Sequence, residues 1–561
     1  MAKHKSVTHK VNLLHSALLM ASMTVAATPS VAEIRADTAL VGTNEPFASN
    51  AVYFVVTDRF VDGDKSNNYP QDSGYMLPIS LKGEQANVGF MGGDFKGLLE
   101  HADYIREMGF NSIWMTPIVE NPAQAFSGGD EIKPEGFAMD RNKAAYHGYW
   151  GTNFYKLDKH LPSANLDYQA LNKALADKGL STILDVVLNH GSPAYTMSAE
   201  QAKSSFYGKL FDKDNNLVAD HQNLAPQALK ANEPLHAWFN NKPDLAQLAD
   251  MDTSNPEVMD YFVGANLQWL QQGASAFRID TVKHVPKQHW GEFTRKIRQQ
   301  YPNLFMFGEV YSFDADEIGQ YTQSENGGMS VLDFPLKAAL NQVFADGADY
   351  HTLLAALYLK AENNPYRNPY DLLTFYDNHD MPRMAADDNG FIDAHNWLFT
   401  ARGIPVIYYG SEMGFERGKG EHFGNRNYYG EQGVQQALTH PIRNALIPIA
   451  ALRQSLPSLQ RGLQVNLDFT ENTAAFYRIL QQEQGLQISL VLLNKSDVAQ
   501  AIKVEDLPQG EWREPLIKQQ RLLATEQVFT VPAHGVRVLV LDNAVLTQDI
   551  KTKLSGLYLA E

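Results

Sequence analysis

The 561-residue sequence contains no cysteine. Disulfide bonds, thiolate metal sites and cysteine nucleophiles are therefore excluded. Positive charge is also scarce, because 47 lysines and arginines face 64 aspartates and glutamates and leave a net charge of −17. Such acidity argues against a nucleic-acid partner, whose phosphates it would repel. With 44% hydrophobic residues the chain can bury a large core, and its length favours more than one domain.

Beyond its first residues, the sequence lacks any apolar run long enough to span a bilayer. Residues 1–32 combine three lysines, an apolar stretch at 11–27 and the small-x-small sequence Ser30-Val31-Ala32, a pattern typical of a cleaved signal peptide. A membrane anchor is the alternative, but His15 and several Ser and Thr interrupt the apolar stretch. We therefore expect an exported protein, periplasmic or secreted, with no membrane contact after signal removal.

Short apolar runs alternate with helical patterns through most of the chain. The runs lie at 51–57, 111–117, 181–188, 274–279, 304–308, 330–334, 372–376 and 403–409, and the main helical patterns at 97–108, 167–178, 256–272, 287–300 and 389–401. Eight such units predict an α/β fold, a (β/α)8 TIM barrel, over residues 47–455. A barrel of this kind needs only about 250 residues, so its loops must carry insertions. The longest follows the third strand and is expected to form a domain B at 190–255.

The pattern changes after about residue 456. Short alternating runs at 473–480, 487–493, 527–531 and 535–541 are separated by turn-like segments. They predict a C-terminal antiparallel β-sandwich domain over 456–545. The tail at 546–561 is compatible with either a helix or a loose segment.

Polar residues follow four of the predicted barrel strands. They are Asp185 with Asn189-His190, Arg278 with Asp280, Glu309, and Asn378-His379-Asp380. Barrel chemistry lies at the carboxyl ends of the strands, so these side chains should converge on one mouth. Several carboxyl groups in one cleft suit glycoside hydrolysis, in which one attacks the anomeric carbon and another protonates the leaving oxygen. Arg278 should keep Asp280 ionised, and neighbouring carboxylates should raise the pKa of Glu309.

These segments resemble the four signature regions of the alpha-amylase family of glycoside hydrolases (glycoside hydrolase family 13). They read DVVLNH at 185–190, FRIDTVKH at 277–284, GEV at 308–310 and YDNHD at 376–380, with further matches GGDFKGL at 92–98, YHGYW at 146–150 and GIPVIYYGSE at 403–412. The resemblance implies that Asp280 is the nucleophile, Glu309 the acid/base and Asp380 the third catalytic carboxylate. It also implies contacts with substrate, from Tyr149, His190, Arg278, Lys283, His284 and His379.

Calcium is the cofactor that the same resemblance implies. Asn189, Asp250 and the backbone carbonyl of His284 match ligands that hold the long third-strand loop against the barrel, and calcium favours such hard oxygen donors. A second site is expected from a loop after the first strand, completed by the Gly-Gly-Asp motif. Its residues are Asp62, Asp64, Asn67, Asn68, Gly92 and Asp94. The loop is not an EF-hand, because its twelfth position is Ser73, and an ordinary Asx-rich turn is the alternative.

One departure from the family pattern concerns the segment before Arg426. Many relatives place an Asp four residues before this Arg, whereas His422 occupies that position here and Glu421 precedes it. The sugar contacts expected of the missing Asp therefore have no assigned residue.

The sequence also contains an insert at residues 75–90, to which no role is assigned.

The expected function is that of a retaining hydrolase acting on α-1,4-glucosidic bonds of starch or maltooligosaccharides, as a monomer. The Lys283-His284 pair favours α-1,4-glucan over α-1,6 bonds or sucrose by resemblance. A glucanotransferase of the cyclodextrin glucanotransferase type is the nearest alternative, and a non-catalytic carbohydrate-binding protein a more distant one. The lack of further β domains after the predicted sandwich favours the hydrolase, because such transferases usually carry them.

Overall fold

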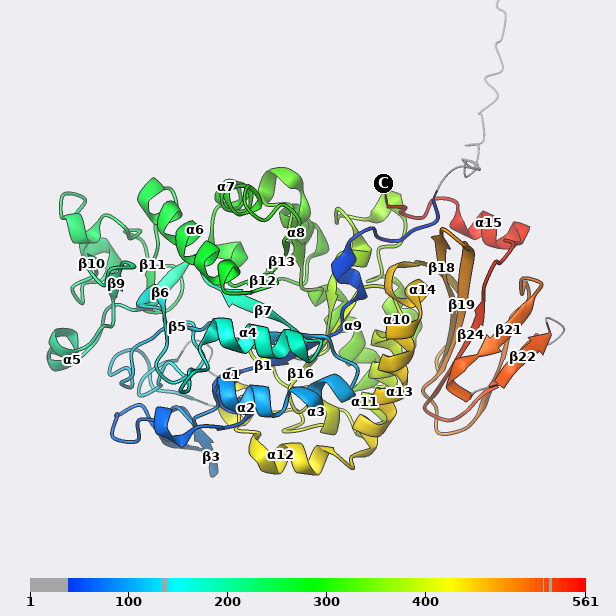
Figure 1. Cartoon of the computed structure of the whole chain (residues 1–561), viewed down its shortest axis with the longest axis horizontal. Helices are drawn as coiled ribbons and strands as arrows, with labels where there is room; N and C mark the ends of the chain where they lie inside the picture. The colour runs from blue at the N-terminus through cyan, green and yellow to red at the C-terminus, as the bar shows by residue number, and fades with distance from the viewer. Residues whose placement is uncertain (1–38, 134–138, 518, 524–526, 561) are drawn as a thin grey trace, which may run out of the picture.

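The computed structural model describes residues 39–133, 139–517, 519–523 and 527–560; the expected signal peptide lies outside them. Eight parallel strands form a nearly closed barrel in the order β14-β13-β12-β7-β4-β1-β16-β15, and a parallel bridge from Leu332 to Leu373 joins its two edges (Figure 1). The strands are β1 (Val52–Val55), β4 (Ser112–Met115), β7 (Ser181–Val186), β12 (Ala276–Ile279), β13 (Phe305–Gly308), β14 (Ser330–Val331), β15 (Leu373–Thr374) and β16 (Ile404–Tyr408). Each falls within one predicted apolar run, so the predicted fold class is confirmed.

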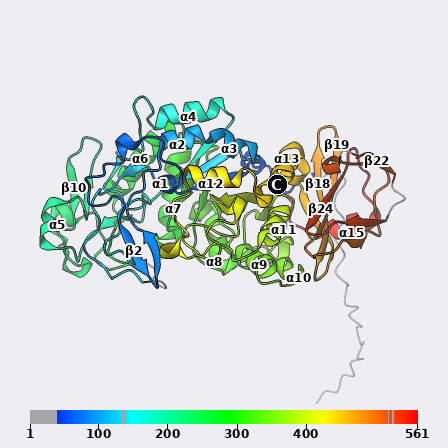
Figure 2. The same cartoon turned by 90° about the horizontal axis from the view of Figure 1, so that it is seen from below.

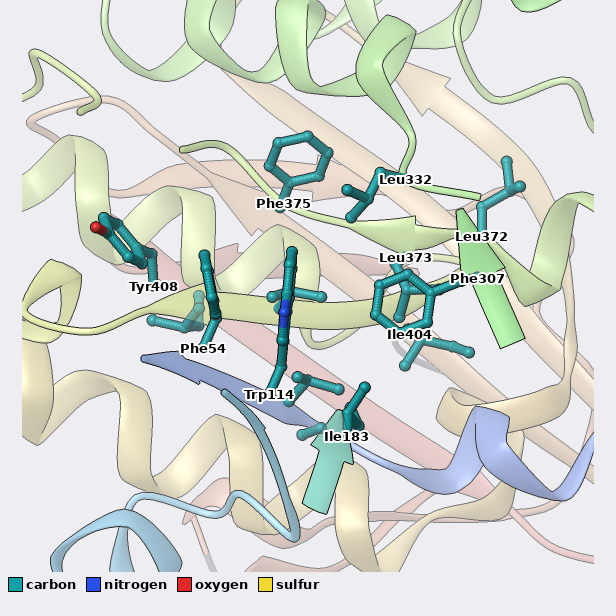
Figure 3. Packing of buried hydrophobic residues seen from close by; sticks show 14 of the residues in the cluster. Phe54, Trp114, Ile183, Phe307, Leu332, Leu372, Leu373, Phe375, Ile404 and Tyr408 are labelled. Carbon is teal, nitrogen blue, oxygen red and sulfur yellow. The ribbon is translucent and has the colours of Figure 1, made fainter. Parts of the chain in front are cut away.

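Large aromatic side chains fill the barrel interior. Trp114 on β4 stacks on Phe54 of β1 with ring centroids 3.8 Å apart, and Phe307 of β13 meets Trp114 edge-on at 5.6 Å (Figure 3). Tyr408 of β16 packs on the other side of Phe54. Parallel strands are buried on both faces, which explains why their sequences read as continuous apolar runs.

Helices surround the barrel. They include α2 (Phe95–Glu100), α3 (Ala102–Glu107), α4 (Tyr168–Asp177), α6 (Pro256–Gln271), α7 (Lys287–Arg298), α9 (Phe334–Phe344), α11 (Asp388–Leu398), α12 (Gly430–Ala437) and α13 (Pro441–Ser455). Side chains of Asp94, Asp167 and Asp387 cap the first turns of α2, α4 and α11 by accepting backbone N–H groups. The single helix predicted at 97–108 is divided at His101, so this part of the prediction is wrong in detail.

Three excursions from the barrel lie near the predicted site. After β4 the chain forms β5 (Val119–Glu120) and β6 (Asn153–Leu157), and after β1 it forms a hairpin of β2 (Pro78–Leu81) and β3 (Glu84–Asn87). Between β7 and α6 lie β8 (His190–Pro193), α5 (Ala199–Ser204), β9 (Lys209–Phe211), β10 (Leu217–Asp220) and β11 (Leu248–Asp250). This last excursion projects from the end of the molecule opposite the C-terminal sheet (Figures 1 and 2).

The C-terminal part is an antiparallel β domain. Its larger sheet has the order β17 (Leu463–Phe469), β18 (Thr473–Gln482), β19 (Gly485–Asn494), β24 (Gly535–Leu541), β21 (Glu511–Glu514) and β22 (Gln519–Leu523), and β20 (Gln500–Lys503) pairs with β23 (Val528–Val531). The undecided tail contains α15 (Gln548–Leu554), which buries Ile550 and Leu554. Among the described residues, no helix combines the length and apolarity needed to cross a membrane.

Candidate active site

Strand register brings the predicted catalytic residues to one mouth of the barrel. Arg278 of β12 pairs with Asp185 of β7, and one residue later Ile279 pairs with Gly308 of β13. The ladder continues past the strand ends, since the N–H of Asp280 donates to Val186 at 2.9 Å and that of Glu309 to Ile279 at 2.8 Å. Asp280 and Glu309 therefore leave adjacent strands at the same level.

The backbone bends sharply after Asp280. Thr281 has a φ of +48°, a left-handed conformation that a β-branched residue rarely adopts. Its hydroxyl oxygen is buried without a hydrogen-bond partner. Such strain is typical of functional sites, where the surrounding structure holds it in place. The bend follows directly on the end of β12 and Asp280, and it starts the short helical turn of Val282–His284.

A fully buried guanidinium joins the carboxyl groups. Arg278 Nη1 lies 2.6 Å from Asp280 Oδ1 and 2.9 Å from Asp185 Oδ1, while Nη2 lies 2.9 Å from Glu309 Oε1. This last contact lacks hydrogen-bond alignment, because both of its atoms have no hydrogen-bond partner. Burial opposes the charge of Arg278, but Asp185 and Glu309 raise its pKa well above the usual value. Arg278 is thus a permanent cation that orients Asp280.

Glu309 has the protonation behaviour of a catalytic acid. Burial raises the pKa of its carboxyl well above the ordinary value, Asp380 and Asp280 raise it further, and Arg278 opposes the shift. The sequence predicted a raised pKa from neighbouring carboxylates, whereas burial is the larger cause here. The direction of this shift favours the protonated carboxyl that a catalytic acid needs.

Asp380 is held from two sides in the segment that follows β15. Its Oδ1 accepts a hydrogen bond of 2.7 Å from Arg426 Nη2, and its Oδ2 lies 3.3 Å from His379 Nε2. Arg426 also donates to the His379 carbonyl at 2.9 Å, which fixes the guanidinium against this segment. Asp380 keeps some exposure, with 18% of its side chain accessible. It can therefore meet a ligand directly.

The three carboxyl groups line one cavity of about 450 Å³, within the usual range of about 300–1,000 Å³ for ligand pockets. Five of the six predicted substrate-contacting residues also line it, namely Tyr149, His190, Lys283, His284 and His379. Arg278 lies beneath the cavity floor and touches the carboxylates instead. The strand-end residues thus converge as the sequence predicts.

Aromatic and imidazole groups form one wall of the cavity. The Tyr149 hydroxyl donates to Asp185 Oδ2 at 2.8 Å, and its ring stacks on His379 with centroids 5.4 Å apart. Asp185 also accepts from the Trp114 indole at 2.9 Å, so it positions this wall from below. Burial lowers the pKa of His190 and holds that of His379 well below the usual value. Both imidazoles are therefore neutral hydrogen-bonding groups at neutral pH.

Several cavity residues had no predicted role. His147 and Trp150 flank Tyr149 in the YHGYW motif, and the buried Nε2 of His147 has no partner. The motif itself was the signal that would have found them. Glu421, rather than His422, lines the cavity beside Arg426, and Lys143 lies across from it. Nothing in the sequence connects Lys143 with Glu421.

The residues of the first predicted calcium site lie together beside the cavity. The Asn189 amide donates to Asp244 Oδ2 at 3.3 Å, and His284 Nδ1 lies 2.9 Å from the same oxygen. Burial raises the pKa of Asp250 to about 7, and the charge of Asp244 adds to this effect. Two neighbouring carboxylates, one of them with a raised pKa, form a group that a cation would stabilise. Asp244 was not among the residues that the sequence predicted for this site.

The loop of the second predicted site holds three buried oxygens that lack any hydrogen bond. They are Asp62 Oδ1, Asn67 Oδ1 and Asn68 Oδ1. The amide nitrogens of Asn67 and Asn68 are used elsewhere. Asn68 Nδ2 donates to Asp62 Oδ2 at 2.8 Å, and Asn67 Nδ2 donates to Asp94 Oδ2 at 3.1 Å. Orphaned oxygens of this kind are the donors that calcium requires.

Two further residues of this loop differ in how they contribute. Gly92 has a φ of +93°, and a Cβ there would lie 2.4 Å from Asn68 Oδ1, so only glycine fits beside the oxygens. The Asp64 side chain instead accepts hydrogen bonds from the N–H and hydroxyl of Ser66. Within the described ranges, no group of three or more His, Asp or Glu side chains has the arrangement of a metal site. Both clusters would thus depend on amide and backbone oxygens as well as carboxylates.

Comparison with known proteins gives the same assignment for most of the chain. A model of the family described as "Alpha amylase, catalytic domain" matches residues 54–445. An alpha-amylase of Niallia circulans is 29% identical over 495 residues, covering 85% of this chain and 86% of the relative. A cyclomaltodextrin glucanotransferase of Bacillus licheniformis is 30% identical over 471 residues, but these cover 82% of this chain and only 61% of the relative.

A solved structure resembles most of the described fold. It is a cyclomaltodextrin glucanotransferase described as having a three-domain ABC distribution, 28% identical, with a TM-score of 0.71. The match covers 89% of this chain and 99% of the relative. Similarity of this kind includes the C-terminal β domain as well as the barrel.

Proposed function

The chain belongs to the alpha-amylase family of glycoside hydrolases, and from this membership we propose that it is a retaining enzyme which cleaves α-1,4-glucosidic bonds of starch or maltooligosaccharides. One observation carries the proposal. Asp280, Glu309 and Asp380 line a single cavity, and one buried guanidinium contacts the first two. A set of carboxyl groups with one protonated and others ionised is what glycoside cleavage needs.

In this proposal each group has a role that its geometry supports. Asp280 attacks the anomeric carbon and forms a glycosyl ester, while Glu309 gives its proton to the departing glycosidic oxygen. Glu309, now ionised, then takes a proton from water, whose oxygen displaces Asp280 and restores both residues. Asp380 holds sugar hydroxyls near the reacting carbon, and Arg278 keeps Asp280 in position for attack.

Hydrolysis is favoured over transfer by the leaving-group side of the cavity. Transfer requires an acceptor sugar that outcompetes water, which aromatic side chains promote. The excursion between β7 and α6 supplies Leu245, Ala246 and Leu248 to the cavity, and its tyrosine, tryptophan and phenylalanine residues do not line it. Tyr311, after β13, also lines the cavity but is compatible with either activity, so the preference rests on the small residues of the excursion. Domain number does not separate the two activities, because the structural relative with three domains is itself a glucanotransferase.

A product assay tests this preference. Soluble starch and maltoheptaose should each yield linear maltooligosaccharides with a steady rise in reducing ends, and no cyclodextrins. Ala246→Tyr should raise the ratio of transfer to hydrolysis about tenfold, equivalent to about 1.4 kcal/mol of acceptor binding by ring stacking. Ala246→Ser, which stays small, is the matched control. Cyclodextrins formed early in the reaction by the wild-type enzyme would contradict the hydrolase and support the glucanotransferase alternative.

The pH profile tests the role of Glu309. Its acid form is required, so kcat/KM should fall on the alkaline side as pH rises through its raised pKa. Asp380→Asn removes a negative charge that raises this pKa, so the alkaline limb of the residual activity should move to lower pH. Asp260→Asn, an exposed carboxylate on α6, should leave the limb in place. If the alkaline limb of Asp380→Asn stays in place or moves to higher pH, Glu309 is not the catalytic acid.

Calcium at both clusters is part of the proposal. Asn189, Asp250 and the His284 carbonyl would hold one ion, with Asp244 beside them, and Asp62, Asn67, Asn68 and Asp94 the other. The unpaired oxygens and the raised pKa of Asp250 support this assignment. A bound calcium ion supplies positive charge that cross-links loops through oxygen ligands. We further propose that the protein is exported by residues 1–32 and acts as a periplasmic or secreted monomer.

A further inference from the structure

A small apolar cluster packs against the loop that carries Glu421. It contains Leu81 and Val88 from the β2–β3 hairpin and its flank together with Ile132, and Phe423 and Met139 pack against it. This cluster therefore holds together the β2–β3 hairpin, the excursion after β4 and the loop after β16 that carries Glu421. An ion pair adds to it, since Lys419 Nζ lies 2.6 Å from Glu84 Oε2. The insert whose role the sequence left open thus supports the loop that carries Glu421.

Two charged residues that line the cavity form an ion bridge between the excursion after β4 and this loop. Lys143 Nζ lies 3.0 Å from Glu421 Oε1 and 3.2 Å from Asp140 Oδ1. Glu421 Oε1 is also 3.2 Å from Arg426 Nη1, whose other nitrogen contacts Asp380. The side chains of Lys143 and Glu421 are only 7% and 13% exposed. A continuous row of charges thus extends from the excursion after β4 to the catalytic carboxylate.

Both members of the bridge remain charged. Burial opposes the charge of Lys143, but Glu421 and Asp140 raise its pKa above the usual value. Burial also opposes that of Glu421, but Arg426 and Lys143 hold its pKa well below the usual value. Separating the two would leave buried charges less well paired, which is strongly unfavourable. The bridge is therefore a fixed wall rather than a flexible surface contact.

The position of the wall fixes which end of the substrate it meets. Lys283, His284 and Tyr311 line the same cavity, and the proposed function assigns Lys283 and His284 to the leaving-group side. Asp380, which holds hydroxyls of the sugar being cleaved, is joined to Glu421 of the wall through the guanidinium of Arg426. The wall therefore stands on the glycone side, toward the non-reducing end of the chain.

We propose that the Lys143–Glu421 bridge closes the glycone end of the cavity, so that the enzyme engages α-glucans by their non-reducing ends and releases short products. This inference rests on the proposed function and adds the mode of attack. A long chain cannot pass through an end where two loops are tied by an ion pair and an apolar cluster. The charged groups of the wall can instead hydrogen-bond the terminal sugar hydroxyls.

Substrates with a free or a blocked non-reducing end test the proposal. Maltoheptaose derivatives that are unmodified or carry a 4,6-ethylidene group on the terminal sugar would be compared, with product lengths followed by chromatography. The wild-type enzyme should prefer the free substrate by about 100-fold or more in kcat/KM, equivalent to about 2.7 kcal/mol. Equal cleavage of both substrates would overturn the inference while leaving the hydrolase function intact.

Opening the wall should reduce this preference. Lys143→Ala, or Lys143→Met as the variant that keeps the side-chain volume, should lower the ratio of kcat/KM for the free substrate to kcat/KM for the blocked substrate at least tenfold. A merely structural role of Lys143 would lower both values together and leave the ratio unchanged. Lys156→Ala is the matched control, because it removes an ion pair with Glu120 in the same excursion but outside the cavity. An unchanged ratio in folded Lys143 variants would also overturn the inference.

Binding separates failure of the inference from failure of the proposed function. Calorimetry of Glu309→Gln with the same two substrates requires no turnover. Tight binding of the free substrate with weak binding of the blocked one would support a closed end even if no glucan were cleaved. Equal binding of both would overturn it.

Discussion

Asp280→Asn and Glu309→Gln should each lower kcat on soluble starch by about 10⁴-fold or more, as expected when a nucleophile or acid is removed from a site whose groups act together. Asp280→Asn leaves an amide that cannot form the glycosyl ester. Glu309→Gln leaves the leaving oxygen without a proton donor. Released reducing ends measure both, with thermal melting to verify folding.

An activated substrate distinguishes the two roles. α-Maltosyl fluoride carries fluoride as its leaving group, which departs without protonation. Glu309→Gln should therefore still be glycosylated by this substrate, and mass spectrometry should find the maltosyl group on Asp280. Asp280→Asn should not be rescued. Asp103→Asn, an exposed carboxylate paired with Lys178, is the control and should keep full activity. Substantial starch turnover in either catalytic variant would reject the assigned roles.

Exhaustive removal of calcium should lower the melting temperature by about 5 °C or more, because an ion present at 1,000 times its dissociation constant stabilises the folded state by about 4 kcal/mol. The loop of Asp62 holds buried oxygens without partners, and the other cluster holds a carboxyl, Asp250, whose pKa is raised to about 7. Activity should fall as well, since the cluster of Asn189 and Asp250 borders the cavity. Added calcium should restore melting and activity together.

Single substitutions separate the two ions. Asp250→Ala should mainly reduce activity, because its cluster includes His284 at the cavity edge. Asp62→Ala should mainly reduce thermal stability, because its loop lies outside the cavity lining. Asp214→Ala, an exposed carboxylate paired with Lys213, should change neither. The calcium proposal would be wrong if the melting temperature stays unchanged once metal analysis has shown that all calcium is removed.

The barrel could be predicted because its information is local. A strand of a parallel sheet is buried on both faces, so each appears in the sequence as a short apolar run, and all eight were located. Elements without this signal were harder to predict. The break at His101 depends on how α2 and α3 pack, and the tail became a helix because Ile550 and Leu554 find a surface to cover.

The same reasoning explains the outcome at the site. The sequence alone indicated that Asp280, Glu309 and Asp380 share one mouth, because segments that follow the strands of a closed parallel barrel gather at its carboxyl face. Only the tertiary structure decided that Glu421 rather than His422 lines the cavity and that it pairs with Lys143, 278 positions away. The direction of a loop side chain and the burial of a carboxyl group depend on distant segments packing together, and no local pattern in the chain records either.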